Sequence, residues 1–166
     1  GGKLIHAIRS IEPNSSFMGH GGDSMKEAGM QILEHTDDLA MMGFAEVIRH
    51  LPKMIRIMGN TIETISRVKP DRIILIDYPG FNLRLAKKIQ NQTIPVTYFI
   101  LPQAWAWKEK RVETMKSAVD QALSIFPFEE DWYESRGLSA NYVGHPFVEQ
   151  EHLDESSKEF YQRHDL

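Results

Sequence analysis

A carboxylate placed directly after a buried strand is the first candidate for chemistry in this sequence. Residues 71–82 read DRIILIDYPGFN, and the apolar run 73–76 lies between Pro70 and Pro79. Such a run between turn residues is typical of a strand buried on both faces, as in parallel sheets. Ligands of open α/β sheets bind outside the carboxyl ends of their strands. Asp77 follows this strand, so it acts either as a general base or only as a cap for the next turn.

A second segment adds aromatic side chains to the same kind of place. Residues 95–111 read PVTYFILPQAWAWKEKR, a strand that ends at Pro102 and leads to Trp105 and Trp107 before a basic helix start. Tryptophan is seldom placed in a loop for packing alone, and its ring combines an apolar body with a polar N–H group. The pattern predicts a ligand-binding loop, with one indole packed inward and the other lining a cleft.

Five motifs resemble the lipid-A-disaccharide synthase family and follow one another along the chain in that family's order and spacing. They are LIDYPGFN and PQAWAW, described above, with LAMMGFAEV at 39–47, FPFE at 126–129 and YVGHPF at 142–147. The resemblance runs from Gly1 to about Asp154, and PQAWAW before a basic pair is its most specific part. Members of this family are bacterial glycosyltransferases that join two acylated glucosamines.

The resemblance implies an inverting sugar transfer. A 2,3-diacylglucosamine moves from its UDP derivative to 2,3-diacylglucosamine 1-phosphate, which gives a β-1,6-linked disaccharide 1-phosphate and releases UDP. The step needs a base for the acceptor 6-hydroxyl and donors that hold the diphosphate. The resemblance implies Asp77 as the base, with no metal and no cofactor. Many relatives carry a second Asp three residues later, where this chain has Gly80. Its loss either favours Asp77 as the base or means that the site is tuned differently.

The remaining site residues are expected in loops at the carboxyl ends of strands. The turn 19–22, GHGG, either presents N–H groups to a phosphate or is a tight turn that needs positive φ. Asn82 also serves as the expected N-cap of a helix over 81–91, Arg111 is placed to meet an acceptor phosphate, and His145 is either structural or a site residue. The predicted substrate-binding residues are Gly21, Gly22, Asn82, Gln103, Trp105, Trp107, Arg111 and His145.

A helical region at 40–67 has apolar residues at three- and four-residue spacing, with Pro52 expected to divide it into two helices. Cations lie between the apolar positions. This is the composition of a helix that contacts a membrane surface, although core packing with a solvated flank explains it equally well. Because the implied substrates carry acyl chains, the resemblance favours membrane contact, peripheral on the cytoplasmic side of the inner membrane with its anionic lipids. The predicted contact residues are Phe44, Val47, Ile48, Arg49, Leu51, Lys53, Met54, Ile55 and Arg56.

Strands alternate with helical patterns along the chain, which predicts an α/β fold with a Rossmann-like parallel sheet and helices on both faces. The predicted helices are 3–11, 23–29, 81–91, 108–118, 128–136 and 155–164, and the predicted strands are 15–19, 72–76, 95–100, 120–125 and 140–143. By resemblance, residues 1–154 form the acceptor-side domain of a two-domain GT-B enzyme without its first strand. Residues 155–166 begin an interdomain helix. The donor-binding domain is absent, so this part is expected to have no turnover of its own.

Composition excludes several classes of protein. The 166 residues suit one domain, 42% are hydrophobic and 25% charged, and no apolar run reaches the ~18 residues of a membrane-spanning helix. A net charge of −4 argues against general nucleic-acid binding, and without cysteine the chain has no disulfides or thiolate metal ligands. The alternatives are another GT-B sugar-nucleotide enzyme, such as a lipid-linked N-acetylglucosaminyl transferase, an epimerase, or a non-catalytic flavodoxin-like binding module.

Overall fold

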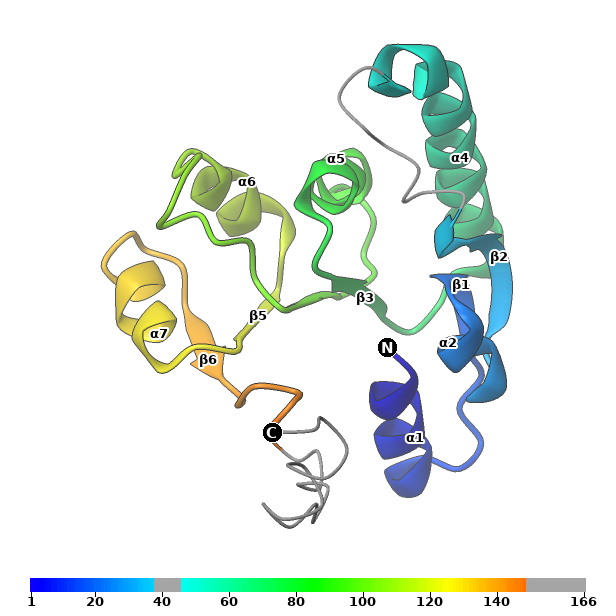
Figure 1. The fold of residues 1–166 in the computed structure, drawn as a ribbon, viewed down its shortest axis with the longest axis horizontal. Helices are drawn as coiled ribbons and strands as arrows, with labels where there is room; N and C mark the ends of the chain where they lie inside the picture. The colour runs from blue at the N-terminus through cyan, green and yellow to red at the C-terminus, as the bar shows by residue number, and fades with distance from the viewer. Residues whose placement is uncertain (38–45, 149–166) are drawn as a thin grey trace, which may run out of the picture.

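The computed structural model describes residues 1–37 and 46–148, with the main chain alone given for 46–50. Helices and strands alternate throughout (Figure 1). In chain order they are α1 (Gly2–Ile11), β1 (Met18–Gly21), α2 (Asp23–Glu27), β2 (Gln31–His35), α4 (Glu46–Val68), β3 (Ile73–Ile76), α5 (Pro79–Ile89), β4 (Val96–Phe99), α6 (Arg111–Ala118), β5 (Gln121–Ser124), α7 (Pro127–Glu134) and β6 (Ala140–Tyr142).

This order confirms the predicted Rossmann-like α/β fold. Two details of the sequence prediction are wrong. The sequence pattern missed β2, whose residues QILEH alternate too weakly in polarity to stand out as a strand. Pro52 does not divide the 40–67 region, because it lies inside the continuous helix α4. The predicted helix over 155–164 lies outside the described residues.

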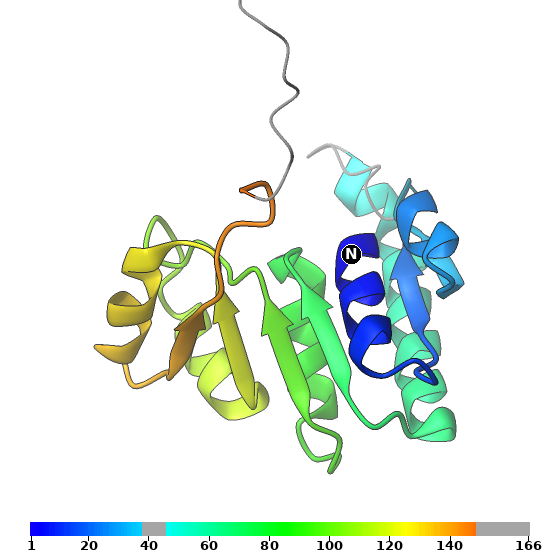
Figure 2. The same ribbon diagram turned by 90° about the horizontal axis from the view of Figure 1, so that it is seen from below.

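The strands form two parallel sheets, one with the order β3-β4-β5-β6 and one with β1 paired to β2. In the larger sheet Leu75 lies opposite Tyr98, and Tyr98 lies opposite Ala122. All its strands run the same way, so their carboxyl ends meet at one edge (Figure 2). Any residue that directly follows one of these strands is therefore brought to that edge.

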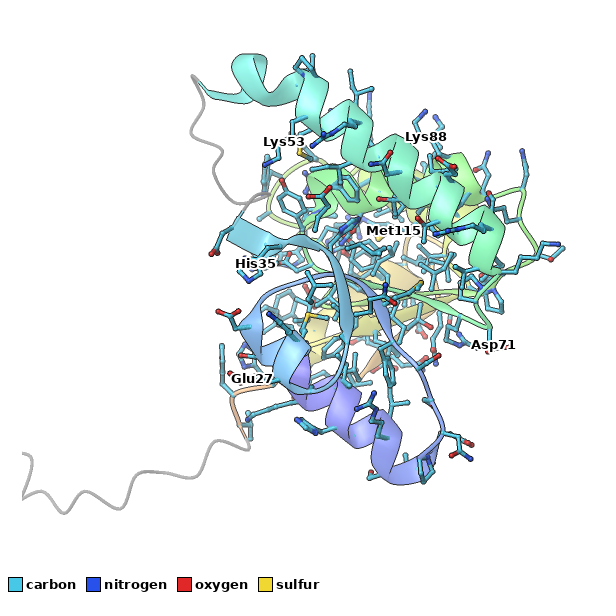
Figure 3. The ribbon with its side chains drawn as sticks, turned by 90° about the vertical axis from the view of Figure 1, so that its right-hand side faces the viewer. Glu27, His35, Lys53, Asp71, Lys88 and Met115 are labelled. Atoms are coloured by element: carbon cyan, nitrogen blue, oxygen red, sulfur yellow. The ribbon has the colours of Figure 1, made fainter. Side chains whose placement is uncertain are left out.

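The helices lie on both sides of the strands. Figure 1 shows α4, α5 and α6 on one side and α1 on the other, and the side view of Figure 3 shows α4 and α1 on opposite sides of β1 and β2. The unpaired edges of β1 and β3 face the space between the two sheets in Figure 2. Both sheets therefore belong to one layer that is interrupted between β1 and β3.

One large apolar core joins the larger sheet to α4 and α5–α7. Its fully buried side chains include Ile57, Ala86, Tyr98, Met115 and Tyr133, and Met115 is labelled in the interior in Figure 3. Each large apolar side chain buried in this way contributes roughly 1.5–3 kcal/mol to folding. A smaller cluster of Ile5, Ala28 and Met30 packs α1 against the other sheet. The larger core gives the carboxyl edge of β3–β6 a rigid base.

Candidate functional site

Asp77 stands at the carboxyl end of β3 on a strained main chain. Asp77 and Tyr78 both have left-handed backbone conformations, with φ of 45° and 44°. Residues other than glycine rarely adopt this region, at a cost of order 1–3 kcal/mol each, and such residues cluster at functional sites. The main-chain N–H group of Asp77 donates to the Phe99 carbonyl oxygen at 3.0 Å. The main chain is thus held in place, while the side chain is exposed.

Asn82 supports this turn from inside the first turn of α5. Its side-chain amide donates to the carbonyl oxygens of Ile76, at 3.1 Å, and Asp77, at 2.6 Å. The predicted role of Asn82 as the N-cap is wrong, because Tyr78 is the N-cap and Pro79 is already helical. Proline suits the first helical position, since it has no N–H group to leave unpaired there.

Tyr98 links Asp77 to Arg111. The Tyr98 hydroxyl donates to the Asp77 carbonyl oxygen at 2.8 Å. Burial raises the pKa of Tyr98 well above its usual value, the Asp77 carboxylate raises it further, and the Arg111 guanidinium opposes the shift. The two charges thus act on the Tyr98 hydroxyl in opposite directions. The fold brings together a carboxylate from the end of β3 and a cation from the start of α6.

Both tryptophans of the 102–107 segment lie at the surface, and the expectation that one is buried is wrong: 39% of Trp105 and 56% of Trp107 is exposed. They differ in their partners. The Trp107 ring faces two cations, the Lys108 ammonium 4.6 Å and the Arg111 guanidinium 4.8 Å from its centroid. This cation–π group presents positive charge beside an aromatic face, an arrangement suited to a phosphorylated ligand.

Trp105 is fixed by a residue that the sequence reasoning did not select. Its indole N–H donates to Glu129 Oε1 at 2.9 Å, and its ring meets Phe128 edge-on at 5.1 Å. Glu129 is wholly buried, and burial raises the pKa of its carboxyl; the bond from Trp105 opposes that shift. In the sequence, the FPFE motif at 126–129 already shows a carboxylate among aromatic residues. Only the fold shows that this carboxylate, Glu129, faces the loop that carries Trp105.

His145 follows β6 and joins a row of aromatic rings. Its imidazole lies 5.8 Å from the Phe126 ring and 5.2 Å from the Phe147 ring, measured between centroids. Phe126 in turn stacks on Phe128 at 5.8 Å. The row of Trp105, Phe128, Phe126, His145 and Phe147 therefore connects the loops after β4, β5 and β6. Gln103, in the first of these loops, is exposed.

Gly21 and Gly22 lie apart from this group, on the smaller sheet. Neither has positive φ, and both have close side-chain neighbours. A Cβ on Gly21 would meet Met30 at 2.6 Å, and one on Gly22 would meet Thr36 at 2.9 Å. Gly22 lines a cavity of about 370 Å³ at the carboxyl ends of β1 and β2, together with His35. The turn therefore borders an open space at the edge where the strands of the smaller sheet end.

The predicted membrane-contact residues are described in part. Leu51 and Ile55 lie one helical turn apart on α4 and are 49% and 64% exposed, whereas Met54 packs against the core. Arg56 is exposed and Lys53 is half-buried. Phe44 and the side chains of Val47, Ile48 and Arg49 lie outside the described residues. Within the described ranges no helix is long and apolar enough to cross a membrane, and no cluster of three metal-ligating side chains occurs.

Comparison with known proteins identifies the relatives of this chain. The family model for lipid-A-disaccharide synthetase matches residues 1–165. A lipid-A-disaccharide synthase from Myxococcus xanthus is 40% identical over 161 residues, covering 97% of this chain and 42% of that protein. The one from Acidobacterium capsulatum is 43% identical, covering 90% of this chain and 37% of that protein. The one from Granulibacter bethesdensis is 38% identical, covering 100% of this chain and 42% of that protein. The chain thus spans about two fifths of the length of these relatives.

Proposed function

The chain belongs to the lipid-A-disaccharide synthetase family, and from that membership we propose that the complete protein is a glycosyltransferase of lipid A assembly. The match over residues 1–165, at about 40% identity to proteins with this activity in their names, carries the proposal. The donor is a UDP-linked 2,3-diacylglucosamine and the acceptor is 2,3-diacylglucosamine 1-phosphate. The product is the β-1,6-linked disaccharide 1-phosphate, formed with inversion.

Asp77 is the proposed general base. A base must reach the acceptor 6-hydroxyl as that oxygen attacks the anomeric carbon, and an exposed carboxylate at the end of a parallel strand suits this role. Its main chain is held by Tyr98 and Asn82, so the backbone that carries the carboxylate starts from a fixed position. Such pre-organisation lowers the cost of reaching the reactive geometry.

The group formed by Trp107, Lys108 and Arg111 is the proposed acceptor-phosphate site. Its two cations lie over one aromatic ring, and Arg111 also acts on the Tyr98 hydroxyl that contacts Asp77. A phosphate bound there would place the acceptor sugar next to the base. Gln103, Asn82, His145, Gly21 and Gly22 remain proposed contacts of the substrates around this edge.

Further segments complete the proposed enzyme. We propose that a parallel strand preceding Gly1 pairs with the unpaired edges of β1 and β3, which would join the two sheets into one. A second, donor-binding domain of the GT-B architecture holds UDP, and residues 155–166 lead toward it. Residues 1–154 without these parts are therefore inactive.

The complete protein works at a membrane surface in this proposal, on the cytoplasmic side of the inner membrane. A substrate with two acyl chains leaves the bilayer only at a large hydrophobic cost, so the enzyme comes to it. Leu51 and Ile55 on α4, with the cation of Arg56 beside them, support a reversible contact with anionic lipid.

The test is an assay of the purified complete protein with both proposed substrates. Formation of the disaccharide 1-phosphate is followed by mass spectrometry and UDP release by a coupled assay, with the acceptor omitted as the control. UDP release that needs the acceptor, together with the disaccharide product, supports the proposal. Hydrolysis of the donor alone, or no turnover, would contradict it.

A further inference from the structure

We propose that Glu129 is a positioning residue for the acceptor: its buried carboxyl holds the Trp105 indole at the rim of the site. Through this bond, helix α7 sets the position of the 102–107 segment, which lies in the loop after β4. What Trp105 then contacts rests on the proposed function. The bond itself rests on the described geometry alone.

One face of α7 holds the segment at two points. The Glu129 carboxyl accepts from Trp105 Nε1–H at 2.9 Å, and the Tyr133 hydroxyl donates to the carbonyl oxygen of Pro102. Glu129 and Tyr133 are four residues apart, so they lie on the same side of the helix. Both are fully buried. The two bonds therefore fix the beginning and the middle of the segment against one rigid element.

The Glu129 carboxyl is buried at a cost that the bond from Trp105 and the nearby main-chain groups of Ile125 and Phe126 offset only in part. Glu129 Oε2 is buried and has no hydrogen-bond partner among the residues that the structure describes. A buried polar atom left unpaired costs roughly 1–3 kcal/mol. Glu129 is also the third residue of α7, where glutamate commonly caps the helix start. Capping accounts for an acid in this turn, but it does not require the bond to Trp105.

The ring that Glu129 holds stands beside the proposed phosphate site. Trp105 is two residues from Trp107, which carries the cations of Lys108 and Arg111. On its other side Trp105 meets Phe128, which is 50% exposed. The Trp105 ring thus packs on an exposed aromatic side chain, and its loop also carries the cationic group of Trp107. An acylated sugar phosphate has matching parts, a charged end and apolar chains.

The test compares Glu129→Met with Glu129→Gln in the complete protein. The glutamine oxygen can still accept from the indole, whereas methionine fills similar space without an acceptor. We expect Glu129→Met to raise the KM for 2,3-diacylglucosamine 1-phosphate about tenfold, while kcat and the donor KM change less than twofold. Glu129→Gln should keep the acceptor KM near wild type. Glu134→Met, at an exposed position of the same helix, is the matched control.

A double-mutant cycle separates positioning from capping. Trp105→Phe removes the indole donor, so Glu129→Met should raise the acceptor KM no further in that background. The indole 15N–1H resonance that disappears in Trp105→Phe should shift in Glu129→Met and stay near its place in Glu129→Gln. An unchanged acceptor KM in Glu129→Met, or additive effects in the cycle, would overturn the positioning role. A wild-type protein without transferase activity would overturn the proposed function instead, while the indole resonance still reports on the Glu129–Trp105 bond.

Discussion

The Tyr98 hydroxyl donates a hydrogen bond of 2.8 Å to the main-chain carbonyl of Asp77. Tyr98 lies on β4, opposite Leu75 of β3. Leu75 precedes Asp77 by two residues. A fully buried side chain in the centre of the sheet thus supports a strained turn at its edge. The core packing of β4 and the main chain of the proposed base are connected through this bond and through the bond from the Asp77 N–H to the Phe99 carbonyl.

Tyr98→Phe tests this link. The substitution removes only the hydroxyl, and the Asp77 carbonyl keeps its bond from Asn82. We expect a loss of about 1 kcal/mol in the free energy of unfolding, the usual value for one hydrogen bond, measured by urea denaturation. In the complete protein kcat should fall while the donor KM is kept. An equal fall in kcat for Thr97→Val, a buried change on the same strand, would show that the effect is not specific to Tyr98.

Asp77→Asn should lower kcat of the complete protein by at least ~10²-fold, because the amide cannot take a proton from the acceptor hydroxyl. Folding should be unchanged, since the side chain is exposed and, among the residues that the structure describes, only main-chain groups of Asp77 form hydrogen bonds. Circular dichroism and thermal unfolding provide the check on folding. Turnover close to wild type in this variant would remove Asp77 from the mechanism.

Arg111→Gln should weaken acceptor binding by removing one of the two cations over Trp107. We expect the acceptor KM to rise about tenfold or more, and the salt dependence of that KM to decrease, since a charged contact is lost. Arg84→Gln, at an exposed position on α5, is the control for a general change in charge. If the two variants behave alike, the Trp107 group does not bind the phosphate.

Leu51→Ser with Ile55→Ser should reduce flotation of the complete protein with vesicles that contain anionic lipid. Both side chains are exposed, so their loss removes apolar contact with the bilayer at little cost to folding. Added salt should weaken binding of the wild type, because the cations act through screened electrostatics. Val68→Ser, exposed at the other end of α4, is the control. Equal flotation of all three proteins would leave α4 as an ordinary packing helix.

Glu129→Gln should change how stability depends on pH. Burial raises the pKa of Glu129 in the folded state above its ordinary value of 4.5. The folded state therefore binds more protons than the unfolded state between the two values, so stability falls as pH rises through that window. The glutamine variant lacks this contribution, and its stability relative to wild type should increase from pH 4 to pH 7. Urea unfolding at both pH values measures the difference, and a difference that is independent of pH would contradict the prediction.

The sequence alone determined the alternating α/β fold and the place of Asp77 after a strand, because both depend on neighbours along the chain. Buried runs and turn residues are local signals, and they located β3, β4, β5 and β6 to within a residue or two. These local signals did not predict the short strand β2, because a strand of mixed polarity is recognised only by its pairing with β1.

Only the tertiary structure decided which loops share the site. The bonds from Trp105 to Glu129 and from Tyr98 to Asp77 join residues that are 24 and 21 positions apart. They form because parallel pairing aligns the carboxyl ends of β3, β4 and β5, and no pattern of spacing encodes that alignment. Likewise, the surface position of both tryptophans follows from the packing of the 102–107 segment on α7. The sequence could identify the residue types, but strand order and helix packing decided which of them meet.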